Sequence, residues 1–416
     1  MHFLLTPFGS SGDVHPYVGI GRRLRERGHA VTVLTAEPHR RVVEGAGLEF
    51  VSVYTEHDYE AATHHPDLWH PTRGLKPVAR LMLLGLEPTW RELEARYVPG
   101  KSFLVGHPLS FATRSFEEKT GAPAATPHLS PFSLRTAHQV PALPGLVDVS
   151  GLPLGIKRAL WWLIDVTQLD PHLVPELNRW RASKGLPAVR RVFREWINSP
   201  RLVLALFPEW FGARQPDWPR AVEFASFPLW DDPHVNPIDA ELEVFLSSGA
   251  PPVVATPGSA NRQAERFFAA VVGALERLGR RGLLLTQYPE QLPRDLPATI
   301  VARKYAPLSR VLPRAVALIH HGGIGTAAQA FAAGVPQLVM PMAFDQADNA
   351  LRAQRLGVAR SVLPKRWTGD AVAAALRALL GDPAVVAAAA RRRDDLRGID
   401  GIALACDALE RSATAA

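Results

Sequence analysis

The chain has 416 residues, of which 47% are hydrophobic and 21% charged, as is typical of a folded protein too long for one ordinary core. Its formal net charge of +7 comes from scattered arginines, so we expect a surface that attracts anionic ligands and no nucleic-acid interface. The one cysteine, Cys406, excludes an intrachain disulfide, and no apolar run approaches the roughly 18–20 residues that span a bilayer. A soluble, cytoplasmic protein is therefore predicted.

The first fifty residues alternate between strand and helix patterns. Strands are predicted at His2–Pro7, Ala30–Ala36 and Leu48–Val53, helices at Tyr17–Arg27 and His39–Gly45, and a Gly/Ser loop at Phe8–Pro16. Strand–helix–strand units of this length are typical of parallel sheets covered by helices on both faces. The opening apolar run is short and ends in turn residues, so we interpret it as a first strand and not as a signal peptide.

The next 150 residues are less regular. We predict a helix at Lys76–Tyr97, a strand at Ser102–Gly106 and a Pro- and Trp-rich insertion at Pro131–Trp196. Two further strands are predicted at Arg201–Phe207 and Val222–Phe227. The stretch Pro228–Pro237 contains three prolines and is the best candidate for a linker between domains.

The alternating pattern restarts after this linker. Helices are predicted at Asp239–Ser247, Arg262–Leu278, Gly325–Ala333, Gln346–Leu356 and Gly401–Arg411, and strands at Val253–Thr256, Leu283–Thr286, Ile300–Ala302, Val316–His320 and Gln337–Met340. We therefore expect two doubly wound α/β domains, residues 1–230 and 231–395, and a C-terminal helical segment, residues 396–416. Two such domains predict a cleft in which ligands bind at the carboxyl ends of the strands.

A glycine-rich turn follows the predicted strand Val316–His320. Gly322 and Gly323 let the backbone approach a ligand closely, and the free N–H groups of a helix that starts near Gly325 suit an anion such as diphosphate. His321 and Thr326 add side-chain donors. The alternative is an ordinary strand-to-helix turn without a ligand.

The surrounding segment carries a longer motif. Residues 320–349 have the sequence HHGGIGTAAQAFAAGVPQLVMPMAFDQADN. This closely resembles the donor-binding signature of the nucleoside-diphosphate-sugar glycosyltransferases that include macrolide, sterol and rhamnolipid-forming members, because H-G-G-x-G-T, G-V-P and D-Q-x-x-N occur in order. The resemblance implies a GT-B fold, in which two Rossmann-like domains face each other across a cleft. It also implies that the N-terminal domain binds the acceptor and the C-terminal domain binds the nucleotide sugar.

The resemblance further implies which residues bind the donor. His321 and the turn Gly323–Thr326 would hold the diphosphate, while Asp345 and Gln346 would hydrogen-bond hydroxyls of the sugar. A second phosphate contact is expected in the turn Gly258-Ser259. The complete set of expected donor-binding residues is Gly12, Ser259, Tyr305, His321, Gly323, Gly325, Thr326, Gln329, Asp345 and Gln346.

Two positions depart from the plant-type pattern of these enzymes. That pattern has a Trp whose ring stacks on the base and, two residues later, Pro-Gln, but here the sequence is Tyr305-Ala306-Pro307-Leu308. It also has a ribose-binding Glu where this chain has Gln329. Gln offers one neutral acceptor oxygen where Glu offers two charged ones. A hydrogen bond from a ribose 2′-hydroxyl therefore contributes less binding energy at this site. Of the two candidate donors, a dTDP-sugar and a UDP-sugar, we therefore favour the dTDP-sugar.

The loop after the first strand contains candidates for the catalytic base. Transfer to a hydroxyl needs a base that accepts the hydroxyl proton, and in the resembling enzymes this is a His or Asp in H-x-x-P or D-x-x-P form. Asp13 has that spacing to Pro16. His15 is the rival, since its reference pKa of about 6.5 makes it the better base unless burial raises the pKa of Asp13. A third reading gives Asp13 only a helix-capping role.

The same motifs indicate the type of reaction. No D-x-D triplet occurs, so no metal is expected, and one in-line displacement would invert the anomeric centre. The phosphate-binding pattern G-x-x-x-x-G-K-[ST] is absent, and Gly19-x-Gly21 lacks the third glycine of a dinucleotide site. The remaining alternatives are a sugar-nucleotide epimerase and a non-catalytic sugar-nucleotide-binding protein of the same fold.

The acceptor is the least specified partner. We expect a small hydrophobic molecule of lipid, polyketide or sterol type, which also leaves peripheral contact with a membrane open, and no oligomeric state is indicated. Aromatic and apolar residues of the insertion could line its pocket or belong to the core. They are Phe132, Trp161, Trp162, Leu163 and Trp180.

Overall fold

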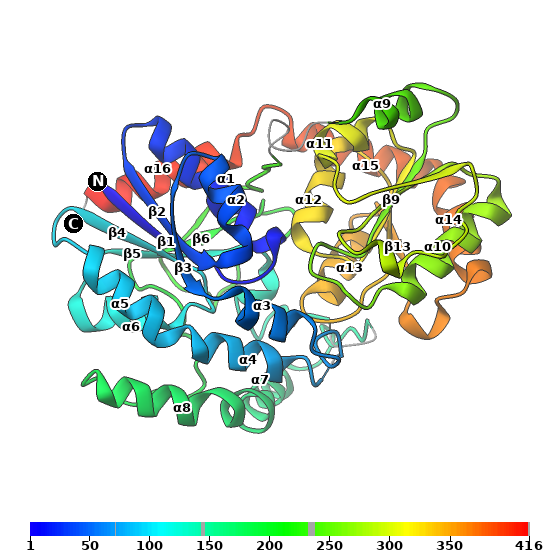
Figure 1. The fold of residues 1–416 in the computed structure, drawn as a ribbon. Helices are drawn as coiled ribbons and strands as arrows, with labels where there is room; N and C mark the ends of the chain where they lie inside the picture. The colour runs from blue at the N-terminus through cyan, green and yellow to red at the C-terminus, as the bar shows by residue number, and fades with distance from the viewer. Residues whose placement is uncertain (71, 143–145, 232–237, 415–416) are drawn as a thin grey trace. The chain divides into compact units, whose positions relative to one another are not determined.

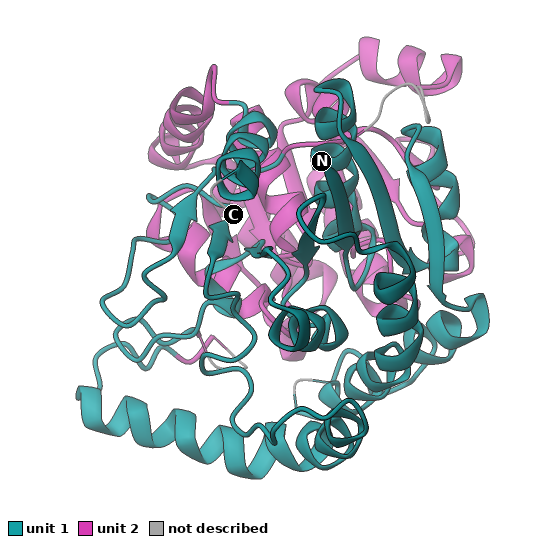
Figure 2. Ribbon diagram, turned by 90° about the vertical axis from the view of Figure 1, so that its left-hand side faces the viewer, with its two compact units in different colours: residues 1–141, 148–228, 400–416 teal, residues 142–147, 229–399 magenta. Residues whose placement is uncertain are grey.

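The computed structural model describes residues 1–70, 72–142, 146–231 and 238–414 and contains two compact units (Figures 1 and 2). Unit 1 comprises residues 1–141, 148–228 and 400–416, and unit 2 comprises residues 142–147 and 229–399. The chain passes from unit 1 to unit 2 at 228/229, close to the predicted domain boundary at 230/231. Residues 232–237 of the predicted linker lie outside the described residues.

Unit 1 contains a parallel sheet of seven strands in the order β3-β2-β1-β4-β5-β6-β7. The strands are β1 His2–Thr6, β2 Ala30–Ala36, β3 Glu49–Tyr54, β4 Ser102–Gly106, β5 Ala124–His128, β6 Leu202–Ala205 and β7 Val222–Phe224. The helices are α1 Ser11–Glu26, α2 Arg40–Gly45, α3 Glu56–Thr63, α4 Leu75–Leu84, α5 Leu86–Arg96, α6 Phe111–Thr120, α7 Leu154–Ile164, α8 Asp170–Ser183 and α16 Gly401–Thr414. Helices α1 and α2 cover one face of the sheet, and α5 and α6 cover the other (Figure 1).

Two helices of unit 1 differ from the prediction. Helix α1 begins at Ser11, not at Tyr17, because Ser10 and Asp13 form an N-terminal cap that extends the helix through the predicted loop. The predicted helix Lys76–Tyr97 is two helices separated at Gly85. Pro88 has no N–H to donate to the carbonyl of Leu84, and the loss of this hydrogen bond favours a break between the two helices.

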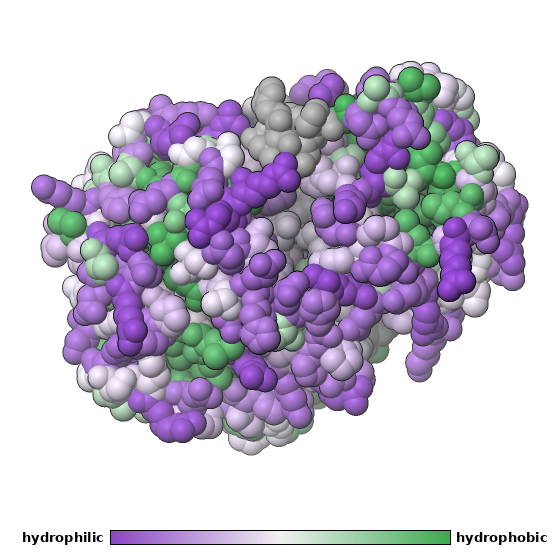
Figure 3. All heavy atoms as spheres, viewed as in Figure 1, coloured by the Kyte–Doolittle hydropathy of each residue, from purple (hydrophilic) through white to green (hydrophobic). Residues whose placement is uncertain are grey.

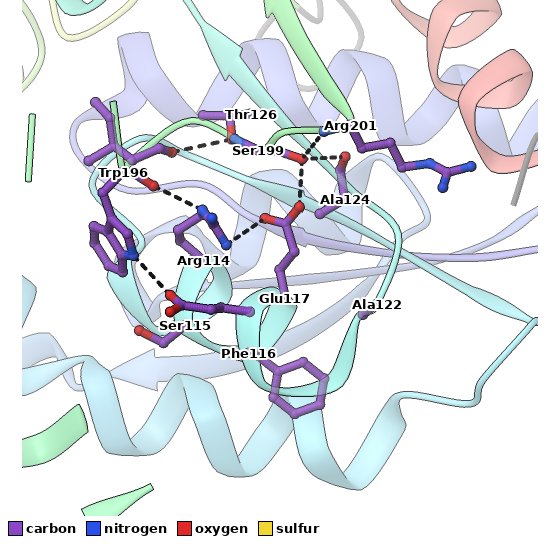
Figure 4. A network of polar contacts seen from close by, with 12 residues as sticks. Arg114, Ser115, Phe116, Glu117, Ala122, Ala124, Thr126, Trp196, Ser199 and Arg201 are labelled. Carbon is purple, nitrogen blue, oxygen red and sulfur yellow. Dashed lines mark hydrogen bonds and ion pairs between the residues drawn. The ribbon is translucent and has the colours of Figure 1, made fainter. Parts of the chain in front are cut away.

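The insertion between β5 and β6 returns to the sheet through a buried polar network (Figure 4). Ser199 Oγ lies 2.7 Å from Glu117 Oε1 and 2.9 Å from the carbonyl oxygen of Ala124. Burial raises the pKa of Glu117, while the charge of Arg114 opposes that rise. The Ser199 N–H donates to Thr126 Oγ1 at 2.9 Å. These bonds tie the end of the insertion to α6 and β5, two elements that the sequence analysis did not predict.

The C-terminal helix α16 belongs to unit 1 and packs against α1. Arg27 Nη1 donates to carboxylate oxygens of Asp407 and Glu410 at 2.7 and 2.6 Å, and Cys406 is buried with its Sγ 3.6 Å from the carbonyl oxygen of Ile20. The segment predicted as a separate C-terminal part thus completes one face of the first unit.

Unit 2 contains a parallel sheet of six strands in the order β10-β9-β8-β11-β12-β13. The strands are β8 Val253–Thr256, β9 Gly282–Leu285, β10 Ile300–Arg303, β11 Ala317–His320, β12 Gln337–Val339 and β13 Ala359–Ser361. The helices are α9 Ala240–Ser247, α10 Glu265–Leu278, α11 Leu308–Val311, α12 Ile324–Ala333, α13 Gln346–Arg355, α14 Gly369–Leu380 and α15 Pro383–Leu396.

Side chains of unit 2 form a core on each face of its sheet. Val253 packs in the cluster that includes α10 and α14, whereas its neighbour Val254 packs in the cluster that includes α9 and α12. Successive strand residues point to opposite faces, so a strand buried on both sides must be apolar throughout. This explains why the continuous apolar run Val253–Thr256 predicted β8 to the residue.

The surface drawn in Figure 3 is mainly hydrophilic, with hydrophobic side chains in separate patches. No single helix in the described ranges is both long and apolar enough to cross a membrane, although the bent pair Gly369–Leu380 and Pro383–Thr414 passes by length and composition. Within the same ranges, no group of three His, Cys, Asp or Glu side chains could hold a metal ion.

Candidate functional site

In unit 1, β1 and β4 are neighbours in the sheet. The chain continues from β1 to β2 on one side of this pair and from β4 to β5 on the other side. Ligands of doubly wound sheets bind at such a switch point, outside the carboxyl ends of the strands. The segment Gly9–Asp13 follows β1 there and His107 follows β4. The ring of His107 lies 6.2 Å from that of Phe8 and 6.3 Å from that of Tyr17.

Asp13 lies in the first turn of α1 with its two carboxylate oxygens in different situations. Oδ2 accepts hydrogen bonds from the backbone N–H of Ser10 at 2.8 Å and from the Ser10 hydroxyl at 3.0 Å. Oδ1 has no hydrogen-bond partner in the part of the chain that the structure describes. The capping role considered from the sequence is therefore present, but it uses one oxygen and leaves the other available.

Burial changes the relative basicity of the two candidate bases. It raises the pKa of Asp13 above the ordinary 3.8, although the two hydrogen bonds from Ser10 oppose this. It also lowers the pKa of His15 to about 4, with a smaller contribution from His39. As a free side chain, His15 has the higher pKa of the two and is the stronger base. Because burial raises the pKa of Asp13 and lowers that of His15, this difference becomes smaller, which favours Asp13 as the base.

Gly9 makes the position of Asp13 possible. Its φ is +126°, a conformation that favours glycine, and a Cβ there would lie 2.3 Å from Asp13 Oδ2. A Gly9→Ala variant should therefore displace the carboxylate and reduce kcat by at least about tenfold, because strain of this kind costs on the order of 1–3 kcal/mol. Steady-state kinetics and thermal unfolding of the same sample would measure both effects.

Gly121 offers a matched control for the strain at Gly9. Its φ is +69° at the C-terminus of α6, and a Cβ there would meet nothing within 4 Å. Gly121→Ala should lower stability by a comparable amount with kcat unchanged. Equal losses of kcat in the two variants would contradict the specific role of Gly9.

In unit 2 two loops meet at the switch point between β8 and β11, which are neighbours in the sheet. His321 is buried directly after β11, and its ring lies close to two glycines. A Cβ at Gly323 would lie 2.4 Å from His321 Nε2, and one at Gly258 would lie 2.8 Å from it. The predicted turn Gly258-Ser259, which follows β8, is therefore brought beside His321, and the Ser259 side chain is exposed.

The two histidines at the end of β11 have different situations. His320 Nδ1 accepts from the Gly322 N–H at 3.1 Å, and its Nε2 therefore donates to Gln337 Oε1 at 3.0 Å. His321 Nδ1 is buried with no hydrogen-bond partner among the described residues. Burial lowers the pKa of His321 to about 4, and the nearby backbone of Thr256 opposes this. His320 thus shapes the turn, and His321 has a nitrogen left for a ligand.

Helix α12 starts immediately after this turn. Gly323 is its N-cap, so the first N–H groups, which include those of Gly325 and Thr326, have no partners within the helix. Gly322 has a φ of +98°, and a Cβ there would lie 2.9 Å from the carbonyl oxygen of Gln346. The glycine turn is thus packed between α12 and α13, where a helix N-terminus can attract an anion.

The D-Q-x-x-N residues are partly engaged in holding this turn. Asn349 Nδ2 donates to the carbonyl oxygen of Gly322 at 2.9 Å and to Asp345 Oδ2 at 2.7 Å. Gln346 Oε1 accepts from the N–H groups of Met342 and Ala343 at 2.8 and 3.2 Å. Gln346 can therefore offer a sugar only its amide N–H groups, a restriction that the motif did not reveal.

The other two expected donor-binding residues lie on separate elements of unit 2. Tyr305 is half-buried in the loop between β10 and α11. Gln329 lies on α12, is 8% exposed, and its side-chain amide makes no hydrogen bond within the described residues. The side-chain amide of Gln329 is thus available to a ligand.

The aromatic residues of the insertion do not form one cluster. Trp180 packs on the core of unit 1, with its ring 5.5 Å from that of Trp90. Trp161 Nε1 donates to the carbonyl oxygen of Thr136 at 2.8 Å. Trp162 is 55% exposed, and Leu163 and Phe132 are also exposed. Of the two alternatives considered from the sequence, membership of the core applies to Trp180, and the other residues lie in different surroundings.

Three histidines of unit 1 were not predicted as functional residues: His39 and His128, which are buried, and His107, which is half-buried. His39 follows β2, His107 follows β4, and His128 ends β5. Burial lowers the pKa of all three, to about 4, 3 and 4 respectively. A search for polar residues at the ends of predicted strands would have found His39 and His107, whereas His128 required β5 to be recognised.

Comparisons with known proteins cover nearly the whole chain. Residues 3–115 match the Glycosyltransferase family 28 N-terminal domain, and residues 283–398 match the Erythromycin biosynthesis protein CIII-like, C-terminal domain. O-mycaminosyltylonolide 6-deoxyallosyltransferase of Streptomyces fradiae is 32% identical over 99% of this chain and 97% of that protein.

Solved structures are similar over the same extent. The glycotransferase of kitacinnamycin has a TM-score of 0.74 at 22% identity, covering 99% of this chain and 98% of that one. Spinosyn rhamnosyltransferase SpnG complexed with thymidine diphosphate has a TM-score of 0.68 at 20% identity, covering 97% and 99% of the two chains. These likenesses indicate a common fold.

Proposed function

The chain belongs to the GT-B family of nucleoside-diphosphate-sugar glycosyltransferases, and on this premise we propose the reaction that it catalyses. It moves a hexose or deoxyhexose from a dTDP- or UDP-sugar to a hydroxyl of a small, largely apolar acceptor. The transfer inverts the anomeric centre and needs no metal ion. The family membership does not favour the epimerase or the non-catalytic binding protein considered from the sequence.

The observation that carries this proposal is the unpartnered, buried Nδ1 of His321 beside the start of α12. A buried polar atom without a partner is costly, and a bound diphosphate would remove that cost by accepting a hydrogen bond from the ring. The free N–H groups at the start of α12 add a partial positive charge. Together they stabilise the charge that builds up on the diphosphate as it leaves.

The acceptor hydroxyl is activated in unit 1. Asp13 Oδ1 accepts its proton while the hydroxyl oxygen forms a bond to the anomeric carbon and the bond from that carbon to the diphosphate breaks. Ser10 holds the other oxygen of Asp13 throughout. Because the attack occurs in one displacement from the side opposite the leaving group, the configuration at the anomeric carbon is inverted.

We propose a dTDP-sugar as the donor and an acceptor of polyketide type. Gln329 has an uncommitted neutral amide on α12, which gains less from a ribose 2′-hydroxyl than a charged carboxylate would. SpnG was solved with thymidine diphosphate, and the Streptomyces fradiae relative is named for transfer of a 6-deoxyallosyl group to O-mycaminosyltylonolide. Both names support this choice.

Binding of nucleotides to the wild type tests the donor. Both dTDP and UDP should raise the thermal midpoint, because a ligand that binds only the folded state stabilises it by mass action, and dTDP should bind more tightly in direct competition. Gln329→Glu should move the preference toward UDP. A tenfold or greater preference of the wild type for UDP would contradict the dTDP proposal, and the absence of binding by either nucleotide would contradict the proposed function.

A further inference from the structure

His39 contacts the loop that carries the proposed base. It is 4% exposed, and its Nε2 lies 3.2 Å from the carbonyl oxygen of Gly9. A carbonyl oxygen only accepts, so Nε2 carries the proton and donates. The ring is also held edge-on against Tyr59, with the centroids 5.5 Å apart. His39 is thus fixed on the side of Gly9 that faces the end of β2.

Gly9 is the point from which the position of Asp13 is controlled. The residue that follows it, Ser10, donates both of the hydrogen bonds that hold Asp13 Oδ2. Rotation of the peptide group between Gly9 and Ser10 would move the Gly9 carbonyl and the Ser10 N–H together, because the two belong to one rigid plane. The hydrogen bond from His39 therefore fixes the direction in which the Ser10 N–H points.

We infer that His39 is a positioning residue for transfer: by anchoring the Gly9 carbonyl, it fixes the Ser10 N–H on Asp13 Oδ2 and so directs Asp13 Oδ1 to the acceptor hydroxyl. The inference rests on the proposed role of Asp13 as the base. His39 touches neither substrate, and its effect passes through one peptide plane and one backbone hydrogen bond.

The ionisable groups around this arrangement are few. Burial and then the charge of Asp13 raise the pKa of Tyr17, and the half-buried ring of His15 and the buried ring of His39 have pKa values of about 4. His107 packs against Tyr17 and has a pKa of about 3. These histidines are neutral near pH 7, so His39 acts there through its neutral Nε2–H.

Two variants separate the hydrogen bond from the shape of the side chain. His39→Phe keeps an aromatic ring against Tyr59 but cannot donate, while His39→Gln keeps an N–H donor. We expect His39→Phe to lower kcat about tenfold, because losing the bond to the Gly9 carbonyl misaligns the Ser10 N–H and so weakens one hydrogen bond to the charged Asp13, with dTDP affinity unchanged. A hydrogen bond to a carboxylate lowers its pKa, so the acid limb of the pH profile of kcat/KM should move to higher pH. His39→Gln should restore both values toward wild type.

His2 provides the matched control. Its Nε2 lies 2.7 Å from Thr32 Oγ1 at the opposite end of β1, so His2→Phe should leave kcat and the acid limb unchanged. If His39→Phe does not fold, His39→Leu, which also lacks a donor, replaces it. The inference is overturned if a folded variant without the donor has the kcat and the acid limb of the wild type. It is also overturned if His39→Gln does not restore the kcat that His39→Phe loses. The proposed function fails separately, if neither dTDP nor UDP binds to the wild type.

Discussion

An Asp13→Asn variant is expected to lose about 10²–10⁴ of its turnover while binding the nucleotide as well as the wild type does. Asn keeps the size of the side chain and one acceptor oxygen, but it cannot take the proton of the acceptor hydroxyl. Single-turnover kinetics with a dTDP-sugar, together with calorimetry of dTDP binding, would measure both quantities.

The pH dependence of the wild type gives a second view of Asp13. A base must be deprotonated to act, so kcat/KM should fall as the pH falls through the pKa of Asp13. Because burial raises that pKa, the fall should occur above the ordinary value of 3.8. The acid limb should be absent from the residual activity of Asp13→Asn.

Asp58 is a matched control for the capping role of Asp13. It occupies the same position in α3, where its Oδ2 accepts from the backbone N–H and the hydroxyl of Thr55 at 3.1 and 2.6 Å. Asp58→Asn should therefore cost a similar amount of helix stability and leave turnover unchanged. The assignment of the base is wrong if Asp13→Asn keeps most of its turnover while His15→Ala loses it.

Replacing His321 by Ala should weaken the binding of dTDP and UDP by roughly 1.5–3 kcal/mol, the range for hydrogen bonds to charged groups. The variant removes the unpartnered nitrogen that we propose as a donor to the diphosphate and leaves α12 and its glycine turn in place. Isothermal calorimetry would measure the change as roughly a 10- to 100-fold higher Kd.

The control for His321 is a buried histidine of unit 1. His128 bonds to Ser133 Oγ and Asn198 Oδ1 at 2.8 and 2.7 Å, so His128→Ala should lower the thermal midpoint without changing nucleotide affinity. Unchanged affinity in His321→Ala for both nucleotides would remove His321 from the binding site.

The sequence predicted most strands well because each is a short segment rich in apolar and β-branched residues. Residues 30–36, 102–106 and 253–256 are strands with the predicted bounds. The start of α1 was wrong, since the cap between Ser10 and Asp13 outweighs the glycines that suggested a loop. β5 was missed because its sequence, AATPH, contains a proline and no β-branched residue other than Thr126.

The alternation of strands and helices, the donor-binding motif and the two candidate bases could all be predicted from the amino-acid sequence, because they are local patterns. Which of these patterns come into contact could be learned from the folded chain alone. His39 lies against Gly9, 30 residues away, the turn after β8 lies beside His321, and α16 packs on α1. These contacts follow from strand order and register. Their energy comes from packing between segments far apart in the chain, and a local sequence pattern carries no information about such packing.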